Sequence, residues 1–199
     1  MMYRSFIKRL LDLFLALILL PFLFILAIPV SIVIYREDKG SPFYIAHRLG
    51  RNMKKFKMVK FRTMKINAED IRNPDGSTFN SADDPRQTRV GKWLRKTSID
   101  ELPQIINVLK GEMSFIGPRP SPLGNEGRYP KFYFKKFNVR PGVTGLTQAK
   151  LRNKATMQER MEMDVYYSEH ISFLMDLGIL ILTLKTVLLQ KNIHRNESD

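Results

Sequence analysis

The chain has 199 residues, enough for one compact domain and an appendage, because single domains commonly run to about 100–150 residues. It contains no cysteine, which excludes disulfides, cysteine-ligated zinc and thiol catalysis. Thirty-three Lys and Arg residues against nineteen Asp and Glu give a net charge of +14, so we expect an anionic partner such as nucleic acid, phospholipid headgroups or a nucleotide.

An uncharged apolar run lies near the N-terminus. Residues 13–34 contain no charged side chain, and seventeen of these twenty-two positions are Leu, Ile, Phe or Val. At about 1.5 Å per residue, a helix of this length crosses a hydrocarbon core of about 30 Å. Pro21 and Pro29 lie within the run, and each removes a backbone donor, so we expect a kink near its middle.

Basic residues flank this run on both sides. Arg4, Lys8 and Arg9 precede it, and Arg36 and Lys39 follow it. Because Lys and Arg accumulate on the cytoplasmic side of a membrane helix, this pattern favours a re-entrant helix that bends at the first proline over a kinked span. A cleaved signal peptide is disfavoured, since its apolar region is usually only about 7–15 residues long.

The following segments predict a hairpin, a loop and two short helices. Residues 43–48 and 56–63 are rich in aromatic and apolar side chains, which is typical of paired strands. Residues 67–86 are polar and contain turn-forming pairs, which predicts a long loop. Helices are expected over 90–96 and 103–110, and a glycine directly after the second favours a left-handed cap.

Two adjacent carboxylates, Asp100 and Glu101, lie before the second of these helices, and Arg119 follows it. Neighbouring acids can hold a divalent metal or present a nucleophile, and arginine binds phosphate oxygens in a planar fork. If Pro103 takes the first helical position, both acids lie just outside the helix start, where free amides favour phosphate. Alternatively, Ser98 and Glu101 form a capping box that needs no catalysis.

Two further segments bear on the membrane. Residues 128–137 interleave aromatic and basic side chains, which suits the headgroup interface and also suits stacking on nucleic acid bases. Residues 168–189 predict a long apolar helix, but Asp176 and Lys185 leave too short an uncharged stretch for a second span. We expect this helix in the core or on the membrane surface.

Five motifs appear in order and carry a family resemblance: Lys60-Phe-Arg-Thr-Met64, Asp100-Glu-Leu-Pro-Gln104, Asn107-Val-Leu-Lys-Gly111, Gly117-Pro-Arg-Pro120 and Arg140-Pro-Gly-Val-Thr-Gly-Leu-Thr-Gln148. From Tyr3 to about Leu189 the chain resembles the small monotopic phosphoglycosyl transferases, also called bacterial sugar transferases. Within that family the likeness is greatest to the members that transfer diacetamido-bacillosamine phosphate.

The resemblance implies an α+β, mostly helical fold with a re-entrant membrane helix over residues 1–36. Residues 37–199 would form a cytoplasmic catalytic domain with interfacial amphipathic helices and a small β-hairpin, on the bacterial inner membrane. The implied activity transfers a sugar 1-phosphate from a UDP-sugar to undecaprenyl phosphate with Mg²⁺ and releases UMP. Membrane phospholipid and downstream glycosyltransferases are further expected partners, and nucleic acid is not.

The resemblance also assigns roles to individual residues. Asp100 looks like the nucleophile that forms an aspartyl phosphosugar, and Glu101 its partner in metal or proton handling, with both acids as metal ligands. Substrate or phosphate binding is implied at Lys60, Arg62, Arg119, Arg140, Gln148, Asp164 and Asp176.

The chain departs from the family pattern in three places. It has Leu20-Pro21 where many relatives have Ser-Pro, with a second proline at Pro29, and its loop over residues 67–86 is longer than in the nearest likeness. Residues 150–155 lack the usual Gly-Arg. Two other functions stay open at this point. One is a non-catalytic, membrane-bound scaffold or anionic-lipid-binding module, and the other is a membrane-tethered nucleic-acid binder.

Overall fold

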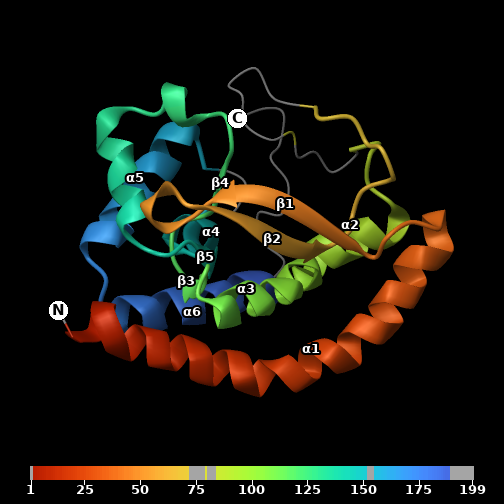
Figure 1. Cartoon of the computed structure of the whole chain (residues 1–199), viewed down its shortest axis with the longest axis horizontal. Helices are drawn as coiled ribbons and strands as arrows, with labels where there is room; N and C mark the ends of the chain where they lie inside the picture. Colours follow the sequence, from red (N-terminus) through yellow and green to blue (C-terminus); the bar gives the residue numbers. More distant parts are fainter. Residues whose placement is uncertain (1, 72–78, 80–83, 152–154, 189–199) are drawn as a thin grey trace.

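The computed structural model describes residues 2–71, 79, 84–151 and 155–188. A long N-terminal helix arches along one side of a domain built from short helices and two small sheets (Figure 1). This architecture confirms the mostly helical α+β fold. The helix begins with a π-helical stretch, Tyr3–Ile7, and continues as α1, Lys8–Asp38. The proposed domain boundary at residue 36 stays a prediction.

The remaining elements alternate between short helices and short strands. In chain order they are β1 Phe43–Leu49, η2 Arg51–Met53, β2 Lys55–Phe61, α2 Arg89–Thr97, η3 Ile99–Gln104, α3 Ile105–Lys110, β3 Ser114–Ile116, β4 Ser121–Pro122, η4 Glu126–Arg128, η5 Lys131–Asn138, β5 Gly142–Thr144, α4 Leu146–Lys150, α5 Met157–Glu169 and α6 Phe173–Leu188.

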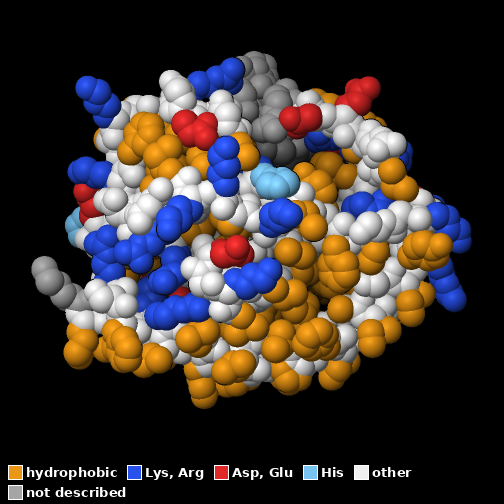
Figure 2. All heavy atoms as spheres, in the orientation of Figure 1, with side chains coloured by type: hydrophobic (Ala, Val, Ile, Leu, Met, Phe, Trp, Pro, Cys, Tyr) orange, Lys and Arg blue, Asp and Glu red, His pale blue; other side chains and the backbone are white. Residues whose placement is uncertain are grey.

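The apolar helix is largely unpartnered. Among the described residues, Tyr3–Asp38 is the helix that is long and apolar enough, by length and composition, to cross a membrane, and only 11% of its most apolar window is buried. Phe22, Phe24 and Ile25 are each at least 60% exposed. Figure 2 shows the resulting band of hydrophobic side chains along the lower edge of the molecule. A core helix of a soluble protein would be mostly buried, so this surface fits a membrane.

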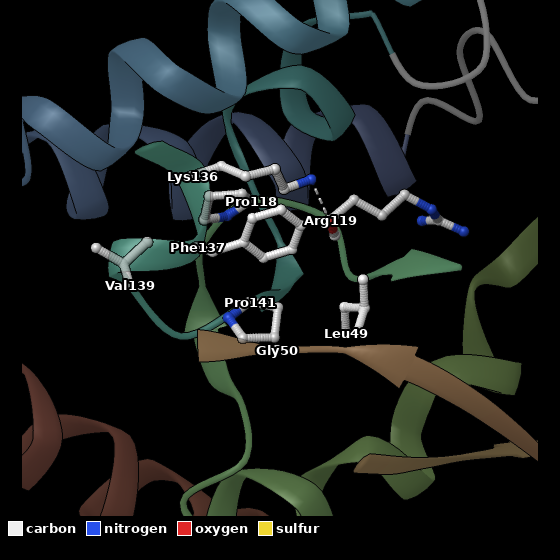
Figure 3. Close-up of a pocket in the computed structure, with 8 residues that line it drawn as sticks. All are labelled: Leu49, Gly50, Pro118, Arg119, Lys136, Phe137, Val139 and Pro141. Atoms are coloured by element: carbon white, nitrogen blue, oxygen red, sulfur yellow. Dashed lines mark hydrogen bonds between the residues drawn. The ribbon is translucent and has the colours of Figure 1, made fainter. Parts of the chain in front are cut away.

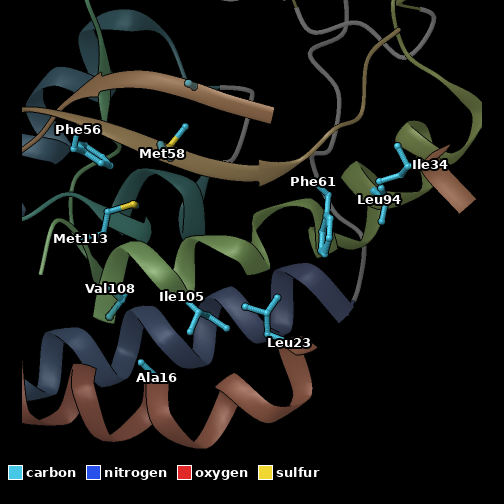
Figure 4. Packing of buried hydrophobic residues seen from close by; sticks show 11 residues of the cluster. Ala16, Leu23, Ile34, Phe56, Met58, Phe61, Leu94, Ile105, Val108 and Met113 are labelled. Carbon is cyan, nitrogen blue, oxygen red and sulfur yellow. The ribbon is translucent and has the colours of Figure 1, made fainter. Parts of the chain in front are cut away.

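One narrow stripe of α1 packs on the domain. Ala16 and Leu23 are buried against Ile105 and Val108 of α3 (Figure 4). On its other side α3 meets the core face of β2, where Met58 is buried. The short helix α3 therefore lies between the apolar helix and the sheet.

The β-hairpin prediction is confirmed. Strands β1 and β2 pair antiparallel, with Tyr44 directly opposite Lys60, and β4 adds a third strand beside β1. Strands β3 and β5 form a separate parallel pair. Here two motif glycines allow close approach, because a Cβ on Gly142 would lie 2.1 Å from the Gly117 nitrogen.

The predicted position of the two acids was wrong. Asp100 and Glu101 lie inside η3, which runs directly into α3, and not outside a helix start at Pro103. Ser98 has a φ of 59° and its side chain makes no capping hydrogen bond, so the capping-box alternative is also wrong. Gly111, at φ 82°, supplies the predicted left-handed cap.

Other expectations are confirmed only in part. Residues 128–137 were expected at the headgroup interface, but Tyr133, Lys136 and Phe137 are buried because η5 packs on α5. The apolar helix predicted from residue 168 begins at Phe173, after α5 ends at Glu169. Parts of the predicted loop 67–86, and residues 152–154 of the 150–155 segment, lie outside the described residues.

Candidate active site

The acid pair lies where η3 packs against β2. Lys60 of β2 donates from Nζ to Glu101 Oε1 at 2.6 Å, and Arg119 NH1 lies 3.8 Å from the same oxygen. The guanidinium of Arg119 is roughly half exposed, whereas Lys60 is mostly covered. The structure therefore brings together four of the predicted site residues: two carboxylates, one ammonium group and one guanidinium group.

The two carboxylates differ in their pKa. Burial, together with the negative charge of Glu101, raises the pKa of Asp100 to about 6, against the opposing effect of Lys60. Burial also acts to raise the pKa of Glu101, but Lys60 and Arg119 outweigh it and lower that pKa below its ordinary value. Glu101 is thus held ionised by its basic partners, whereas Asp100 exchanges its proton near neutral pH. A pair of adjacent carboxylates whose pKa values are shifted in opposite directions is typical of a catalytic site.

A buried network holds the backbone of Arg119. Lys136 Nζ donates to the Arg119 carbonyl at 2.9 Å, to Tyr133 Oη at 2.7 Å and to Asp164 Oδ2 at 2.8 Å. Asp164 also accepts from Tyr133 at 3.1 Å and from Thr147 Oγ1 at 3.2 Å. Figure 3 shows Lys136 and Arg119 beside a small cavity of about 10 Å³, with the Arg119 guanidinium extending away from it.

This network changes the interpretation of Asp164. The sequence implied a ligand to nucleotide or metal, but the carboxylate is 2% exposed and its bonds go to protein groups. Burial lowers the pKa of Lys136, and the adjacent Asp164 opposes that shift. The structure therefore links Asp164 through Lys136 to the backbone of Arg119, and the substrate- or metal-binding role implied for Asp164 stays a prediction.

Three other predicted residues contact different parts of the chain. Arg62 forms a paired interaction with Asp38 at the end of α1. Arg140 donates from Nε to the Gly111 carbonyl at 2.9 Å. Asp176 accepts hydrogen bonds from the start of the apolar helix. None of these contacts joins the residue to Asp100 or Glu101.

Gln148 and Gln104 carry buried amide atoms without a hydrogen-bond partner among the described residues. Neither Nε2 nor Oε1 of Gln148 has a hydrogen-bond partner among the described residues, and the same holds for Nε2 of Gln104. A buried amide without a partner destabilises the fold by about 1–3 kcal/mol. Such groups are expected where a ligand supplies the missing bonds, which fits the substrate-binding role predicted for Gln148.

The sequence analysis missed two residues of this site. Arg95 of α2 contributes a positive charge that favours ionisation of both Asp100 and Glu101. Its signal was available, since it lies only five residues before Asp100 in the sequence. Lys136 had no such signal, because a lysine among aromatic residues resembles a surface residue until the fold buries it.

The acid pair also provides the donors that a magnesium ion prefers. No group of three or more His, Cys, Asp or Glu residues suited to a metal occurs in the described part of the chain. Magnesium commonly binds through one or two carboxylates and completes its shell with water and substrate phosphates. Asp100 and Glu101 therefore fit a metal that is shared with a phosphate substrate.

The domain combines two acids of different pKa with neighbouring basic groups, and it packs on an exposed apolar helix. This combination is typical of a membrane-associated enzyme that binds phosphates. The chain belongs to the bacterial sugar transferase family, whose sequence model matches residues 3–190. This membership confirms the resemblance seen in the motifs.

Three curated relatives illustrate the similarity. The galactosyl transferase CpsE of Streptococcus agalactiae is 42% identical over 77% of this chain and 36% of its own length. The UDP-galactose-lipid carrier transferase of Erwinia amylovora is 39% identical over 92% of this chain and 40% of its own length. The undecaprenyl-phosphate galactose phosphotransferase of Salmonella typhimurium is 36% identical over 92% of this chain and 40% of its own length.

The chain thus spans about two fifths of the length of these relatives. Their names refer to galactose, so the greater likeness to bacillosamine-phosphate transferases stays a prediction.

Proposed function

We propose that the protein transfers a sugar 1-phosphate from a UDP-sugar to undecaprenyl phosphate and releases UMP, as the first membrane step of bacterial glycan or glycoprotein assembly. The observation that carries this proposal is the acid pair. Asp100 is buried, and the adjacent Glu101 is kept ionised by Lys60 and Arg119, which lie beside its carboxylate. The relatives support it, because their names include a UDP-galactose-lipid carrier transferase and an undecaprenyl-phosphate phosphotransferase.

The first half-reaction uses Asp100 as the nucleophile. A carboxylate oxygen of Asp100 attacks the sugar-bearing phosphorus of the donor, and the bond from that phosphorus to the bridging oxygen breaks. UMP leaves with that oxygen, and an aspartyl phosphosugar remains. Lys60 and Arg119 lie where they offset the negative charge that the donor diphosphate brings to the acids.

The second half-reaction regenerates the carboxylate. A phosphate oxygen of undecaprenyl phosphate attacks the same phosphorus, the bond to Asp100 breaks, and the products are a lipid diphosphosugar and a free Asp100. Dividing the transfer in this way means that two anionic substrates never occupy the site together. When bound at Asp100 and Glu101, Mg²⁺ would supply further neutralisation of the phosphate charge.

The docking of α1 supports a monotopic arrangement. Near its start, Tyr3 Oη and Lys8 Nζ donate to Asp176 at 2.6 and 2.7 Å. Near its end, Asp38 pairs with Arg62 of the same domain. If α1 spanned a bilayer, a domain that contacts both of its ends would lie within the hydrocarbon core, where its charged groups are unfavourable.

We therefore propose that α1 is re-entrant and that the domain lies on the cytoplasmic face of the inner membrane. Because the chain has no cysteine, single cysteines can be introduced at each end of α1 without removing others. Both should be protected from an impermeant thiol reagent in intact cells, and an externally labelled end would reject the arrangement.

The activity is tested by UMP release. Purified protein in lipid nanodiscs with undecaprenyl phosphate and Mg²⁺ should release UMP from at least one member of a UDP-sugar panel. Asp100→Asn should abolish the release, and Glu169→Gln, which changes an exposed carboxylate, should not. A scaffold or lipid-binding module would release no UMP from any donor, and that result would reject the proposal.

A further inference from the structure

Helix α1 ends where the chain turns into β1, on the right-hand side of Figure 1. Residues at this end of α1 line a surface groove. It is open and shallow, with a volume of about 450 Å³. Its lining is mostly apolar and combines one aromatic ring, aliphatic groups and two basic side chains. The lining residues are Ser31, Ile32, Tyr35, Arg36, Lys39 and Pro42.

The basic side chains of the groove are not neutralised by their acidic neighbours. Arg36 and Lys39 are three positions apart and flank two carboxylates that turn toward the domain. Glu37 accepts the first backbone amides of α2, and Asp38 pairs with Arg62. Within the described part of the chain, Arg36 and Lys39 have no carboxylate at ion-pair distance. The groove therefore offers two cations without a carboxylate partner, and the Lys39 ammonium group lies 5.5 Å from the centre of the Tyr35 ring.

The groove also has the composition of a headgroup interface. Arg36 is the first charged residue after the apolar run, and Tyr35 and Tyr44 are each about half exposed at this boundary. Exposed tyrosines together with basic residues mark the interface between hydrocarbon and water. Figure 2 shows Lys and Arg side chains at this edge, next to the hydrophobic band.

The first strand connects the groove to the acid pair. Tyr44 follows the lining residue Pro42 by two positions, or about 7 Å along the strand. It lies directly opposite Lys60 in the antiparallel pair, so the two side chains share one face of the sheet. Lys60 in turn contacts Glu101. Tyr44, about half exposed, thus lies between the lining residue Pro42 and Lys60 on the strand pair.

We propose that this groove docks the phosphate end of the acceptor lipid before transfer, an inference that rests on the proposed function. The phosphate lies between Arg36 and Lys39, the first isoprenoid units lie on Ile32 and Tyr35, and Tyr44 lines the path to Lys60. A phosphate monoester carries a charge of about −1.5 to −2 at pH 7, which two cations match. A membrane phospholipid presents one phosphodiester charge beneath a bulky headgroup, and it fits this site less well.

Kinetics test the proposal, because the KM for the acceptor lipid should change and the KM for the UDP-sugar should not. In nanodiscs of fixed lipid composition, Arg36→Gln/Lys39→Gln should raise the KM for undecaprenyl phosphate about tenfold. The KM for the UDP-sugar and the amount of phosphosugar formed without acceptor should stay unchanged. Lys54→Gln/Lys57→Gln removes the same charge from the exposed hairpin and should alter neither KM. An unchanged acceptor KM in the groove variant would overturn the proposal.

A binding experiment tests the site without turnover. The residue Ile32 is replaced by p-benzoylphenylalanine, and the full chain is irradiated in nanodiscs that contain undecaprenyl phosphate, undecaprenol or phosphatidylglycerol. Cross-linking should be several times stronger to the phosphate than to either other lipid. Equal labelling of undecaprenol would exclude recognition of the phosphate, and equal labelling of phosphatidylglycerol would make the groove a general headgroup contact.

The two proposals fail in different ways. If the wild-type protein releases no UMP with any donor, the proposed function fails. If it is active but the groove variant behaves like the hairpin control, only the docking site fails.

Discussion

Lys136 is expected to be the most sensitive lysine in the domain, although nothing in its sequence neighbourhood distinguishes it from Lys135. Its side chain is 4% exposed, that of Asp164 is 2% exposed, and three hydrogen bonds of 2.7–2.9 Å engage its ammonium group. Lys135 pairs with Glu169 at the same 2.7 Å, but those side chains are 55% and 42% exposed. The two adjacent residues therefore form a matched pair for experiment.

Lys136→Met should lower the free energy of unfolding by about 3–5 kcal/mol, because it leaves the Asp164 carboxylate buried without its counter-charge. Lys135→Met should lower it by less than about 1 kcal/mol, since an exposed ion pair contributes little. For a chain of this length, the loss at Lys136 corresponds to a drop in Tm of roughly 6–20 °C. Thermal unfolding in detergent, followed by circular dichroism at the helix band, measures both values.

A second substitution separates charge from packing. In the Lys136→Met background, Asp164→Asn removes the buried carboxylate charge that has lost its partner, and it should recover part of the lost stability. If Lys136→Met and Lys135→Met shift the Tm equally, or if Asp164→Asn worsens the double variant, the reasoning about this buried pair is refuted.

Three further outcomes follow from the site and the docking contacts. The rate of UMP release should rise with pH through about 6, because Asp100 must lose its proton before it attacks. The Glu101→Gln variant should be slower, but in its pH–rate profile this rise should occur at lower pH. The substitution removes a like charge beside Asp100 and frees Lys60, and both effects lower the pKa of Asp100. Asp100→Asn should raise the Tm at pH 8. The pKa of Asp100 is about 6 in the folded chain and 3.8 for the ordinary group, so its ionisation lowers stability by about 3 kcal/mol as the pH rises between these values. An unchanged Tm would contradict the burial of a charged Asp100. Asp176→Asn should weaken the docking of the α1 start and expose it to limited proteolysis, whereas resistance equal to wild type would show that Tyr3 and Lys8 do not depend on the carboxylate.

The elements that local chemistry determines were predictable. Seventeen apolar residues in twenty-two positions define the membrane helix whatever packs around it. The β-hairpin follows from its aromatic and β-branched content, and Gly111 marks the end of α3. In each case a short stretch of sequence contains all the information needed.

The elements that depend on distant contacts were not predictable in the same way. Pro103 favours a helix start, but the left-handed turn at Ser98 begins a 3-10 helix earlier and draws Asp100 into it. The aromatic and basic segment around Lys136 has an interfacial composition, yet its packing on α5 buries it. Burial is a property of the partner surface, which the segment itself does not encode.

The candidate site shows the same division. The motif resemblance assigned Lys60, Arg119 and the acid pair to one site, and the structure brings Lys60 and Arg119 to Glu101. The motifs did not reveal that Asp164 supports Arg119 through Lys136, or that Asp176 docks α1. Both acids bind basic side chains within the chain, and sequence alone does not distinguish such a role from contact with a substrate.

The central claim is a covalent bond between Asp100 and the phosphosugar, and mass spectrometry of the trapped protein tests it most directly. The protein is incubated with Mg²⁺ and its UDP-sugar in the absence of acceptor, quenched, digested and sequenced by tandem fragmentation. The account predicts one phosphosugar per chain on the peptide that contains Asp100, formed together with one equivalent of UMP and discharged on addition of undecaprenyl phosphate. An adduct on another residue, or UMP release by Asp100→Asn at the wild-type rate, would contradict it.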